Sequence, residues 1–214
     1  MSSHPKSGQR SERDFYVTPV EAVIPVVREI RQRWARLSEP VILDPGAGTG
    51  NITATLRLVW PTAHIVAVEI NPQHEAALHA AGASEVVIGD FLTVPLDGFD
   101  LILGNPPFSL AVEFIDRSRE QLNLFGVMAM LLQFNFLGAE KRVDWWKARP
   151  QQAQRTLSPR PSFTEGGKGN DSVDYAWQIW DEQRSPSWPP FDTYHWRESA
   201  EYARTRAERA GVAS

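Results

Sequence analysis

The residues best suited to chemistry form the tetrapeptide Asn105-Pro106-Pro107-Phe108, which follows a short apolar run. Residues 101–103 are Leu, Ile and Leu, a continuous hydrophobic segment typical of a strand buried on both faces of a parallel sheet. Pro106 and Pro107 have no N–H to donate to a sheet ladder, so the strand must stop there. We therefore expect Asn105 at the carboxyl end of a central strand, the edge at which open α/β sheets bind their ligands.

Such a site could methylate an exocyclic amine that is conjugated to a ring. The lone pair of this amine is delocalised, so the nitrogen is a poor nucleophile. The Asn105 side-chain oxygen and the Pro106 carbonyl can accept its two hydrogens, and Phe108 can offer a flat face to the ring. The rate would come from positioning and oriented dipoles rather than from a strong base. The alternative is a plain proline-containing turn, with Ser109 capping the next helix.

Asn-Pro-Pro-Phe resembles motif IV of the amino-methyltransferases, the enzymes that use S-adenosylmethionine to modify adenine N6, cytosine N4 or protein glutamine. The resemblance implies S-adenosyl-L-methionine as the cofactor. It also implies that the whole tetrapeptide is catalytic and that Asn105 contacts the cofactor as well.

A glycine-rich turn follows an earlier apolar strand, at Asp44-Pro45-Gly46-Ala47-Gly48-Thr49-Gly50-Asn51. Glycines let the backbone approach a ligand closely and adopt positive φ. A nicotinamide-binding Gly-x-Gly-x-x-Gly loop that starts at Gly46 would need a glycine where Asn51 stands. The segment resembles motif I of class I methyltransferases. This implies that the cofactor contacts Asp44, Gly46, Ala47, Gly48, Gly50 and Asn51, with Asp44 facing the positive amine of its methionine part.

The next strand, residues 64–70, reaches Glu69, which lies 23 residues after Gly46. A carboxylate at this offset can accept hydrogen bonds from ribose hydroxyls. The alternative is an acid that interacts with the dipole of the helix starting at Asn71-Pro72. We favour ribose binding, with Ile70 beside it in the cofactor site.

A third strand, residues 85–88, ends before Asp90 and Phe91. The family resemblance implies that Asp90 accepts a hydrogen bond from the adenine amine of the cofactor and that Phe91 packs on the adenine ring. The alternative interpretation is that Asp90 is a turn residue and Phe91 a core side chain.

The segment Phe15-Tyr16-Val17-Thr18-Pro19 precedes a periodic apolar pattern that predicts a helix. Thr18 and Glu21 fit a capping box with Pro19 at the first helical position, and Pro25 should kink the helix or delay its start. One interpretation of Phe15 and Tyr16 is a hydrophobic staple at the start of this helix, and a second interpretation fits them equally well. The segment also resembles motif X of the same methyltransferases, which implies cofactor contacts from Phe15, Tyr16, Thr18 and Pro19.

The last third predicts two antiparallel strands, at residues 155–163 and 174–180, joined by a long glycine-containing loop. The stretch from Ser158 to Phe163, together with Tyr175-Ala176-Trp177, resembles phage-type DNA N6-adenine methyltransferases. On this basis the candidate DNA contacts are Arg160, Ser162 and Phe163. Lys168 in the loop is a further candidate, because together with the glycine amides around it this residue could hold a phosphate; the alternative is that the loop is a disordered hairpin tip. A helix at residues 139–149 should pack its two tryptophans on the sheet.

Together these segments predict an α/β fold, a doubly wound seven-stranded mixed sheet of the class I methyltransferase type with a C-terminal antiparallel hairpin. We expect a disordered arm at residues 1–14, the methyltransferase domain at 15–182, and a C-terminal tail at 183–214. Within the domain, residues 133–173 are the candidate nucleic-acid contact region.

Composition limits the other possibilities. The chain has no cysteine, and its 5 histidines do not cluster, so we expect no metal site. Without an apolar leader or a membrane-spanning run, we expect a cytoplasmic location and no membrane partner. The net charge of −4 disfavours nucleic-acid binding, but residues 139–168 carry seven Lys or Arg against three acids, a local excess of +4.

The resulting hypothesis is methyl transfer from S-adenosyl-L-methionine to adenine N6 in DNA, with nucleic acid as the partner. No segment is long enough for a separate target-recognition domain, so RNA adenine and protein glutamine stay as alternative substrates. A catalytically idle cofactor-binding subunit is a third reading, which the intact Asn-Pro-Pro-Phe disfavours.

Overall fold

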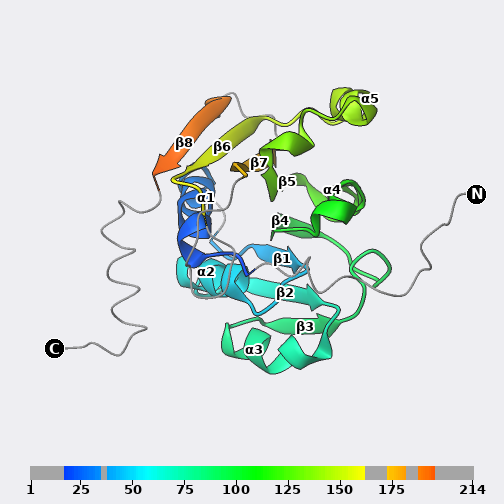
Figure 1. Ribbon diagram of the computed structural model, residues 1–214. Helices are drawn as coiled ribbons and strands as arrows, with labels where there is room; N and C mark the ends of the chain where they lie inside the picture. The colour runs from blue at the N-terminus through cyan, green and yellow to red at the C-terminus, as the bar shows by residue number, and fades with distance from the viewer. Residues whose placement is uncertain (1–16, 35–37, 162–172, 182–187, 196–214) are drawn as a thin grey trace, which may run out of the picture.

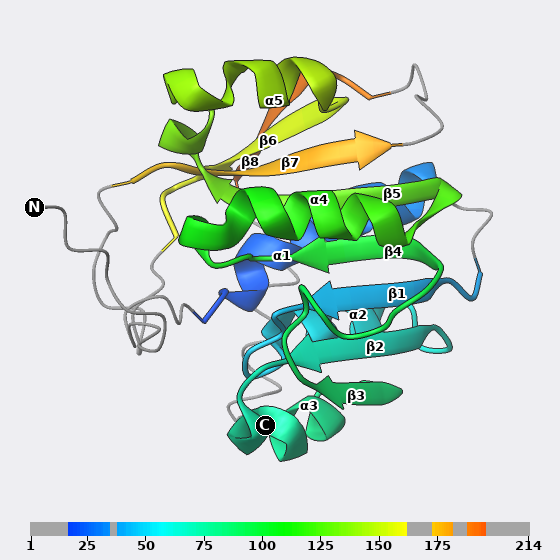
Figure 2. The same ribbon diagram turned by 90° about the vertical axis from the view of Figure 1, so that its right-hand side faces the viewer.

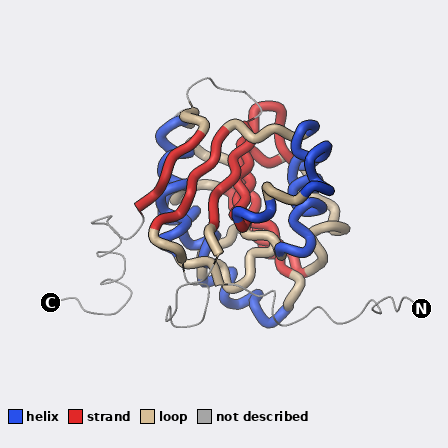
Figure 3. Tube along the Cα trace, turned by 45° about the horizontal axis from the view of Figure 1, so that its top comes forward, coloured by secondary structure: helices blue, strands red, loops and turns tan. Residues whose placement is uncertain are grey.

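The computed structural model describes residues 17–34, 38–161, 173–181 and 188–195. Within these ranges the strands form the centre of the molecule and helices lie on both sides (Figures 1 and 3). The helices are α1 (Val20–Arg33), α2 (Asn51–Val59), α3 (Glu75–Ala80), α4 (Ala111–Gln121) and α5 (Val143–Ala148). The strands are β1 (Val41–Pro45), β2 (His64–Glu69), β3 (Glu85–Ile88), β4 (Phe99–Gly104), β5 (Leu122–Gln133), β6 (Ala153–Ser158), β7 (Tyr175–Asp181) and β8 (Phe191–His195).

The strands form one sheet in the order β3-β2-β1-β4-β5-β7-β6-β8. Strands β1 to β5 are parallel to one another, whereas β7 is antiparallel to both β5 and β6. Figure 2 shows β7 pointing opposite to β1, β2 and β4. The predicted class I α/β fold is therefore confirmed, including the antiparallel hairpin and the position of β4 beside β1.

The sheet has eight strands rather than the seven we expected. The additional strand, β8, lies in the segment expected to be a tail and pairs in parallel with β6, from Gln154↔Phe191 to Ser158↔His195. The sheet thus continues beyond residue 182. Strand β8 is an edge strand, and Phe191 is 72% exposed, so it lacks the continuous buried apolar run that marks the inner strands.

Helix α1 begins differently from the expected capping box. Pro19 precedes the helix as its N-cap, and no side chain caps the helix start. Thr18 instead accepts hydrogen bonds from two asparagines of the site described below. The helix runs through Pro25 without a delayed start, because fully buried Ala22, Val23, Val26 and Val27 anchor it on the sheet.

Two hydrophobic layers hold the sheet between the helices. On one face α1 and α2 pack against alternate residues of β1, β2, β4 and β5, and on the other face α4 packs against the remaining ones. Figure 1 shows α1 and α2 on the opposite side of the sheet from α4 and α5. As predicted, the α5 tryptophans pack inward: the Trp146 ring stacks on that of Trp180, with centroids 6.0 Å apart and an interplanar angle of 5°.

Among the described residues, no helix combines the length and the apolar character that crossing a bilayer requires.

Candidate active site

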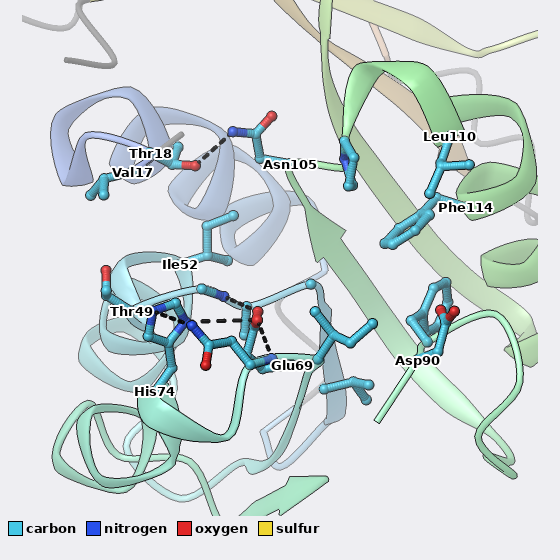
Figure 4. Close-up of a pocket in the computed structure, with 18 of the residues that line it drawn as sticks. Val17, Thr18, Thr49, Ile52, Glu69, His74, Asp90, Asn105, Leu110 and Phe114 are labelled. Carbon is cyan, nitrogen blue, oxygen red and sulfur yellow. Dashed lines mark hydrogen bonds and ion pairs between the residues drawn. The ribbon is translucent and has the colours of Figure 1, made fainter. Parts of the chain in front are cut away.

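A cavity of about 560 Å³ opens at the carboxyl ends of β1, β2 and β4. This volume is within the usual range for a small-molecule site. Many of the predicted site residues line it: Thr18, Gly46, Ala47, Gly48, Asn51, Glu69, Ile70, Asp90, Phe91, Asn105 and Pro107. Residues predicted from separate segments of the sequence therefore converge on one site (Figure 4).

The glycine loop uses its amides to hold its own shape. The amides of Gly46 and Ala47 both donate to the Val68 carbonyl, at 2.8 and 2.9 Å, and the amide of Gly48 donates to Glu69 Oε2 at 2.8 Å. These N–H groups are therefore not available to cradle a pyrophosphate, as the amides of a dinucleotide-binding loop do. Gly46 has a φ of +70°, and a Cβ there would lie 3.3 Å from the Phe114 ring, so a larger residue would crowd the cavity wall.

Glu69 lies at the end of β2 with only 6% of its surface exposed. Besides the Gly48 amide, its carboxylate accepts the amide of Asn71 at 2.8 Å, and His74 Nδ1 lies 3.7 Å from Oε1. Each oxygen accepts one of these two amide bonds and keeps a further lone pair that can accept from another donor. Glu69 can therefore fix the glycine loop and accept a bond from a diol at the same time.

The opposite wall of the cavity combines an acid with two aromatic rings. Asp90 follows β3 and accepts the amide of Leu92 through Oδ1 at 3.1 Å. The rings of Phe91 and Phe114 pack with centroids 4.9 Å apart. Figure 4 shows Asp90 and Phe114 across the cavity from Thr49 and His74. This arrangement suits a flat base that has an exocyclic amine.

Asn105 extends from the end of β4 into the cavity wall, where its side-chain amide meets the start of α1. Asn105 Nδ2 donates to Thr18 Oγ1 at 3.0 Å, and Asn51 Nδ2 donates to the Thr18 carbonyl at 2.9 Å. Asn105 Oδ1 is buried, and none of the described residues forms a hydrogen bond with it. A buried acceptor without a partner is costly, so Asn105 Oδ1 is a candidate to accept a hydrogen bond from a ligand.

Asp44 is fully buried beneath the glycine loop and is not one of the residues that line the cavity. Its Oδ2 accepts the Thr53 hydroxyl at 2.7 Å, whereas its Oδ1 has no partner among the described residues. Burial raises the pKa of the Asp44 carboxyl to about 7, against the hydrogen bonding of Thr53 and with a small contribution from the charge of Glu69. A direct contact between Asp44 and the cofactor stays a prediction.

Four other predicted residues with described positions also lie off the cavity wall, namely Pro19, Gly50, Pro106 and Phe108. Gly50 is the N-cap of α2, and a Cβ on it would meet Ala81 and Leu78, so it faces α3. Phe108 lies just beyond Pro107, which does line the cavity, and its ring centroid is 5.9 Å from that of Tyr175. Phe108 belongs to the Asn105 segment itself, whereas Tyr175 is only 1% exposed and is part of the hydrophobic core.

Arg160, a predicted DNA contact, forms an ion pair in the structure. Its Nε and Nη2 lie 2.6 and 3.3 Å from the two carboxylate oxygens of Asp174, and Arg160 lowers the pKa of that carboxyl. This pairing offsets much of the positive charge that a phosphate contact would use. The predicted residues Phe15, Tyr16, Ser162, Phe163 and Lys168 lie outside the described residues.

Several cavity residues were not predicted from the sequence, including Val17, Ile52, His74, Leu110 and Phe114. Phe114 packs in the hydrophobic layer between α4 and the sheet, and its ring also borders the cavity. His74 lies one helical turn after Asn71, and this spacing could have suggested a position beside Glu69. Among the described residues, no group of three or more His, Cys, Asp or Glu side chains is placed to hold a metal ion.

The comparisons with known proteins agree with this geometry. Residues 29–144 match the family described as the methyltransferase small domain, which is more than half of the chain. The chain belongs to this family. S-adenosyl-L-methionine is accordingly its cofactor, and the cavity fits it: Glu69 can accept from a ribose, Asp90 from an adenine amine, and the glycine loop permits close approach.

The chain is similar to two curated relatives over part of their length. It is 33% identical over 102 residues to the type II methyltransferase M.CvrRI of Paramecium bursaria Chlorella virus XZ-6E, a match that covers 47% of this chain and 26% of the relative. It is 38% identical over 88 residues to the release factor glutamine methyltransferase of Cereibacter sphaeroides, covering 37% of this chain and 32% of the relative. The chain thus spans about a quarter to a third of the length of these relatives.

A solved structure shares the fold. The type I restriction-modification system methyltransferase subunit from Streptococcus thermophilus superposes with a TM-score of 0.61 at 16% identity, covering 79% of this chain and 45% of that one.

Proposed function

We propose that this protein transfers a methyl group from S-adenosyl-L-methionine to the exocyclic N6 amine of adenine in DNA. The observation that carries the proposal is Asn105 Oδ1, a buried acceptor with no hydrogen-bond partner among the described residues, on the wall of the cavity at the end of β4. An amine of a base would supply the missing donor.

The residues of the chain would act mainly by positioning. Asn105 Oδ1 would accept one hydrogen of the amine and the Pro106 carbonyl the other, so that the two hydrogens are held out of the ring plane and the nitrogen lone pair is less delocalised into the ring. Phe108 would pack on the base. S-adenosylmethionine, when bound, would supply an electrophilic methyl group, and the glycine loop, Glu69 and Asp90 would hold the cofactor. A positioned pair of this kind can lower the barrier without a strong base.

Three features support a nucleobase as the substrate. The aromatic ring of Phe108 belongs to the Asn105 segment. The viral relative is named a type II methyltransferase, and the chain carries its local excess of positive charge at residues 139–168. Because the cavity lies at the sheet edge, an adenine in duplex DNA would have to leave the base stack to reach Asn105, or be offered in a single strand.

The similarity to a release factor glutamine methyltransferase favours a second candidate, the side-chain amide of a protein glutamine. This amide also carries an NH₂ group conjugated to a π system, so Asn105 could hold it in the same way. Adenine N6 in RNA is a third substrate that the site could accept. An idle cofactor-binding subunit is disfavoured because the acceptor of Asn105 is retained in a buried, positioned state.

The test offers S-adenosylmethionine with a labelled methyl group to the purified protein with duplex DNA, single-stranded DNA, RNA and a glutamine-containing release factor in parallel. We expect label in DNA, as N6-methyladenine. Long-read sequencing of plasmid from cells that express the chain would then give the flanking bases. Label in RNA or protein with none in DNA would refute the DNA assignment.

The variant Asn105→Ala tests the mechanism. It should reduce methyl transfer by at least about 100-fold, the usual cost of losing a positioned polar group at a reacting centre, while the cofactor dissociation constant changes little. Asn123→Ala is the matched control. Asn123 donates to Asp100 near the first residues of β4 and β5, at the opposite end of these strands from Asn105. Activity that survives in Asn105→Ala would contradict the proposed role.

A further inference from the structure

We infer that Thr18 is a positioning residue for Asn105: its hydroxyl accepts from the amide nitrogen and holds the side chain in place, with the amide oxygen left to meet the amine of the substrate. This inference rests on the proposed function for the identity of the amine. It assigns to Thr18 a role in the methyl-transfer step, beyond the cofactor contact that motif X implies.

The contact joins two segments that are far apart in the chain. Thr18 precedes α1 and Asn105 follows β4, yet Asn105 Nδ2 lies 3.0 Å from Thr18 Oγ1. Figure 4 shows the Asn105 amide with its nitrogen directed at Thr18 and its oxygen directed away from Thr18. Thr18 is itself only 6% exposed, so its hydroxyl has a defined position.

The two ends of a carboxamide have nearly the same shape, so orientation must come from hydrogen bonds. If the Asn105 amide were rotated by 180°, its NH₂ group would occupy the buried position where Oδ1 now has no partner. Two donors would then be unsatisfied instead of one acceptor, which costs more. The Thr18 hydroxyl can accept from the amide nitrogen or donate to the amide oxygen, so it holds the amide in place, while the cost of burying two unsatisfied donors favours the orientation that leaves an acceptor for the substrate.

Thr18 is held in turn by the cofactor side of the cavity. Asn51, the first residue of α2, donates through Nδ2 to the Thr18 carbonyl at 2.9 Å. Asn51, Thr18 and Asn105 form a continuous chain of hydrogen bonds between the end of the glycine loop and the reacting centre. Each of the three residues lines the cavity.

The experiment compares Thr18→Val, which keeps the shape but removes the hydroxyl, with Thr18→Ser, which keeps the hydroxyl. Thr18→Val should lower kcat about fivefold to tenfold, the equivalent of one hydrogen bond, and Thr18→Ser should restore most of it. The dissociation constant of S-adenosylmethionine, measured by calorimetry, should change less than about twofold in both variants. Thr193→Val on the exposed edge strand β8 is the matched control and should keep the wild-type kcat.

An unchanged kcat in Thr18→Val would overturn the inference. So would a loss of cofactor affinity as large as the loss of kcat, because Thr18 would then act on the cofactor and not through Asn105. A Thr18→Ser variant as slow as Thr18→Val would also exclude the hydroxyl as the cause.

A spectroscopic measurement separates this inference from the proposed function. The side-chain NH₂ signals of Asn105, assigned by their loss in Asn105→Ala, should shift and exchange faster with solvent in Thr18→Val. Unchanged signals would overturn the inference whatever the substrate is. If these signals respond but the wild-type protein methylates no adenine, the proposed function fails and the role of Thr18 stands.

Discussion

Asp44 should make the stability of the cofactor-free protein depend on pH. Its carboxyl is fully buried, and burial raises its pKa from 3.8 to about 7. Between these two values the folded state holds a proton that the unfolded chain releases. The stability contributed by the protonated form is therefore present at low pH and is lost as the pH rises from about 4 to 7.

The size of the effect follows from this interval. One pH unit corresponds to about 1.4 kcal/mol, so the whole interval corresponds to about 4 kcal/mol of unfolding free energy. Raising the pH from 5 to 8 crosses most of it and should remove about 3 kcal/mol. Asp44→Asn, which stays neutral at every pH, should not lose this contribution.

Urea unfolding of the wild-type protein and of Asp44→Asn at pH 5, 6, 7 and 8 measures the difference. A pH-independent change in the free energy of unfolding caused by the new amide cancels, because the test compares how the difference between wild type and Asp44→Asn varies with pH. Asp144→Asn is the control, since the side chain of Asp144 is 98% exposed. A difference between wild type and Asp44→Asn that stays the same from pH 5 to pH 8 would show that Asp44 does not titrate as its burial requires.

Two further predictions concern stability. Arg155 is fully buried and its Nε and Nη2 donate to Glu29 at 2.8 and 2.7 Å, so Arg155→Met should cost about 3 kcal/mol, because the Glu29 carboxylate loses both bonds and keeps only those from Arg33 and Tyr194. Urea unfolding should also show Glu29→Met/Arg155→Met to be more stable than this single variant, and the opposite order would contradict the prediction. Gly50→Ala places a Cβ 2.7 Å from that of Ala81 at a φ of +88°, so it should lower the free energy of unfolding by about 2 kcal/mol or more. Gly138→Ala is the control: its Cβ would meet only the Asn135 carbonyl, at 3.9 Å, and the free energy of unfolding should fall far less.

The parts of the fold that local sequence determines could be predicted. Strand β1, the glycine loop and α2 follow from an apolar run, a cluster of glycines and a helical pattern, all within about 20 residues. Glu69, Asp90 and Asn105 each follow such a run, and parallel strands bring their carboxyl ends to one edge of the sheet. Their convergence on one cavity therefore needed no knowledge of side-chain packing.

The parts that depend on distant contacts could not be predicted. The pattern of Thr18 and Glu21 fits a capping box, and nothing near Thr18 indicates that its hydroxyl binds Asn105, 87 residues away. Asp44 lies at the start of the glycine-rich turn, a position that predicts a ligand contact, but its burial depends on how the loop folds over it. Strand β8 has too weak an apolar pattern to be recognised before its partner β6 is known.

The unpredicted strand β8 has a consequence for the site. Tyr194 of β8 donates its hydroxyl to Glu29 of α1, which also accepts the two bonds from Arg155 of β6. Although burial raises the pKa of Glu29, these hydrogen bonds outweigh it and lower the pKa to about 2, so Glu29 is ionised and bonded throughout the neutral range.

The far end of α1 is thus tied to the edge of the sheet, and Trp177 Nε1 donates to the Ala22 carbonyl near its start at 2.8 Å. Both ties bear on Thr18, which lies two residues before this helix and reaches Asn105 only if the helix keeps its position. If Thr18 positions Asn105 as proposed, the last strands of the sheet belong to the same frame that orients the Asn105 amide. A change at Glu29 or Arg155 that leaves the protein folded should lower kcat in the manner of Thr18→Val, with the affinity for the cofactor less affected.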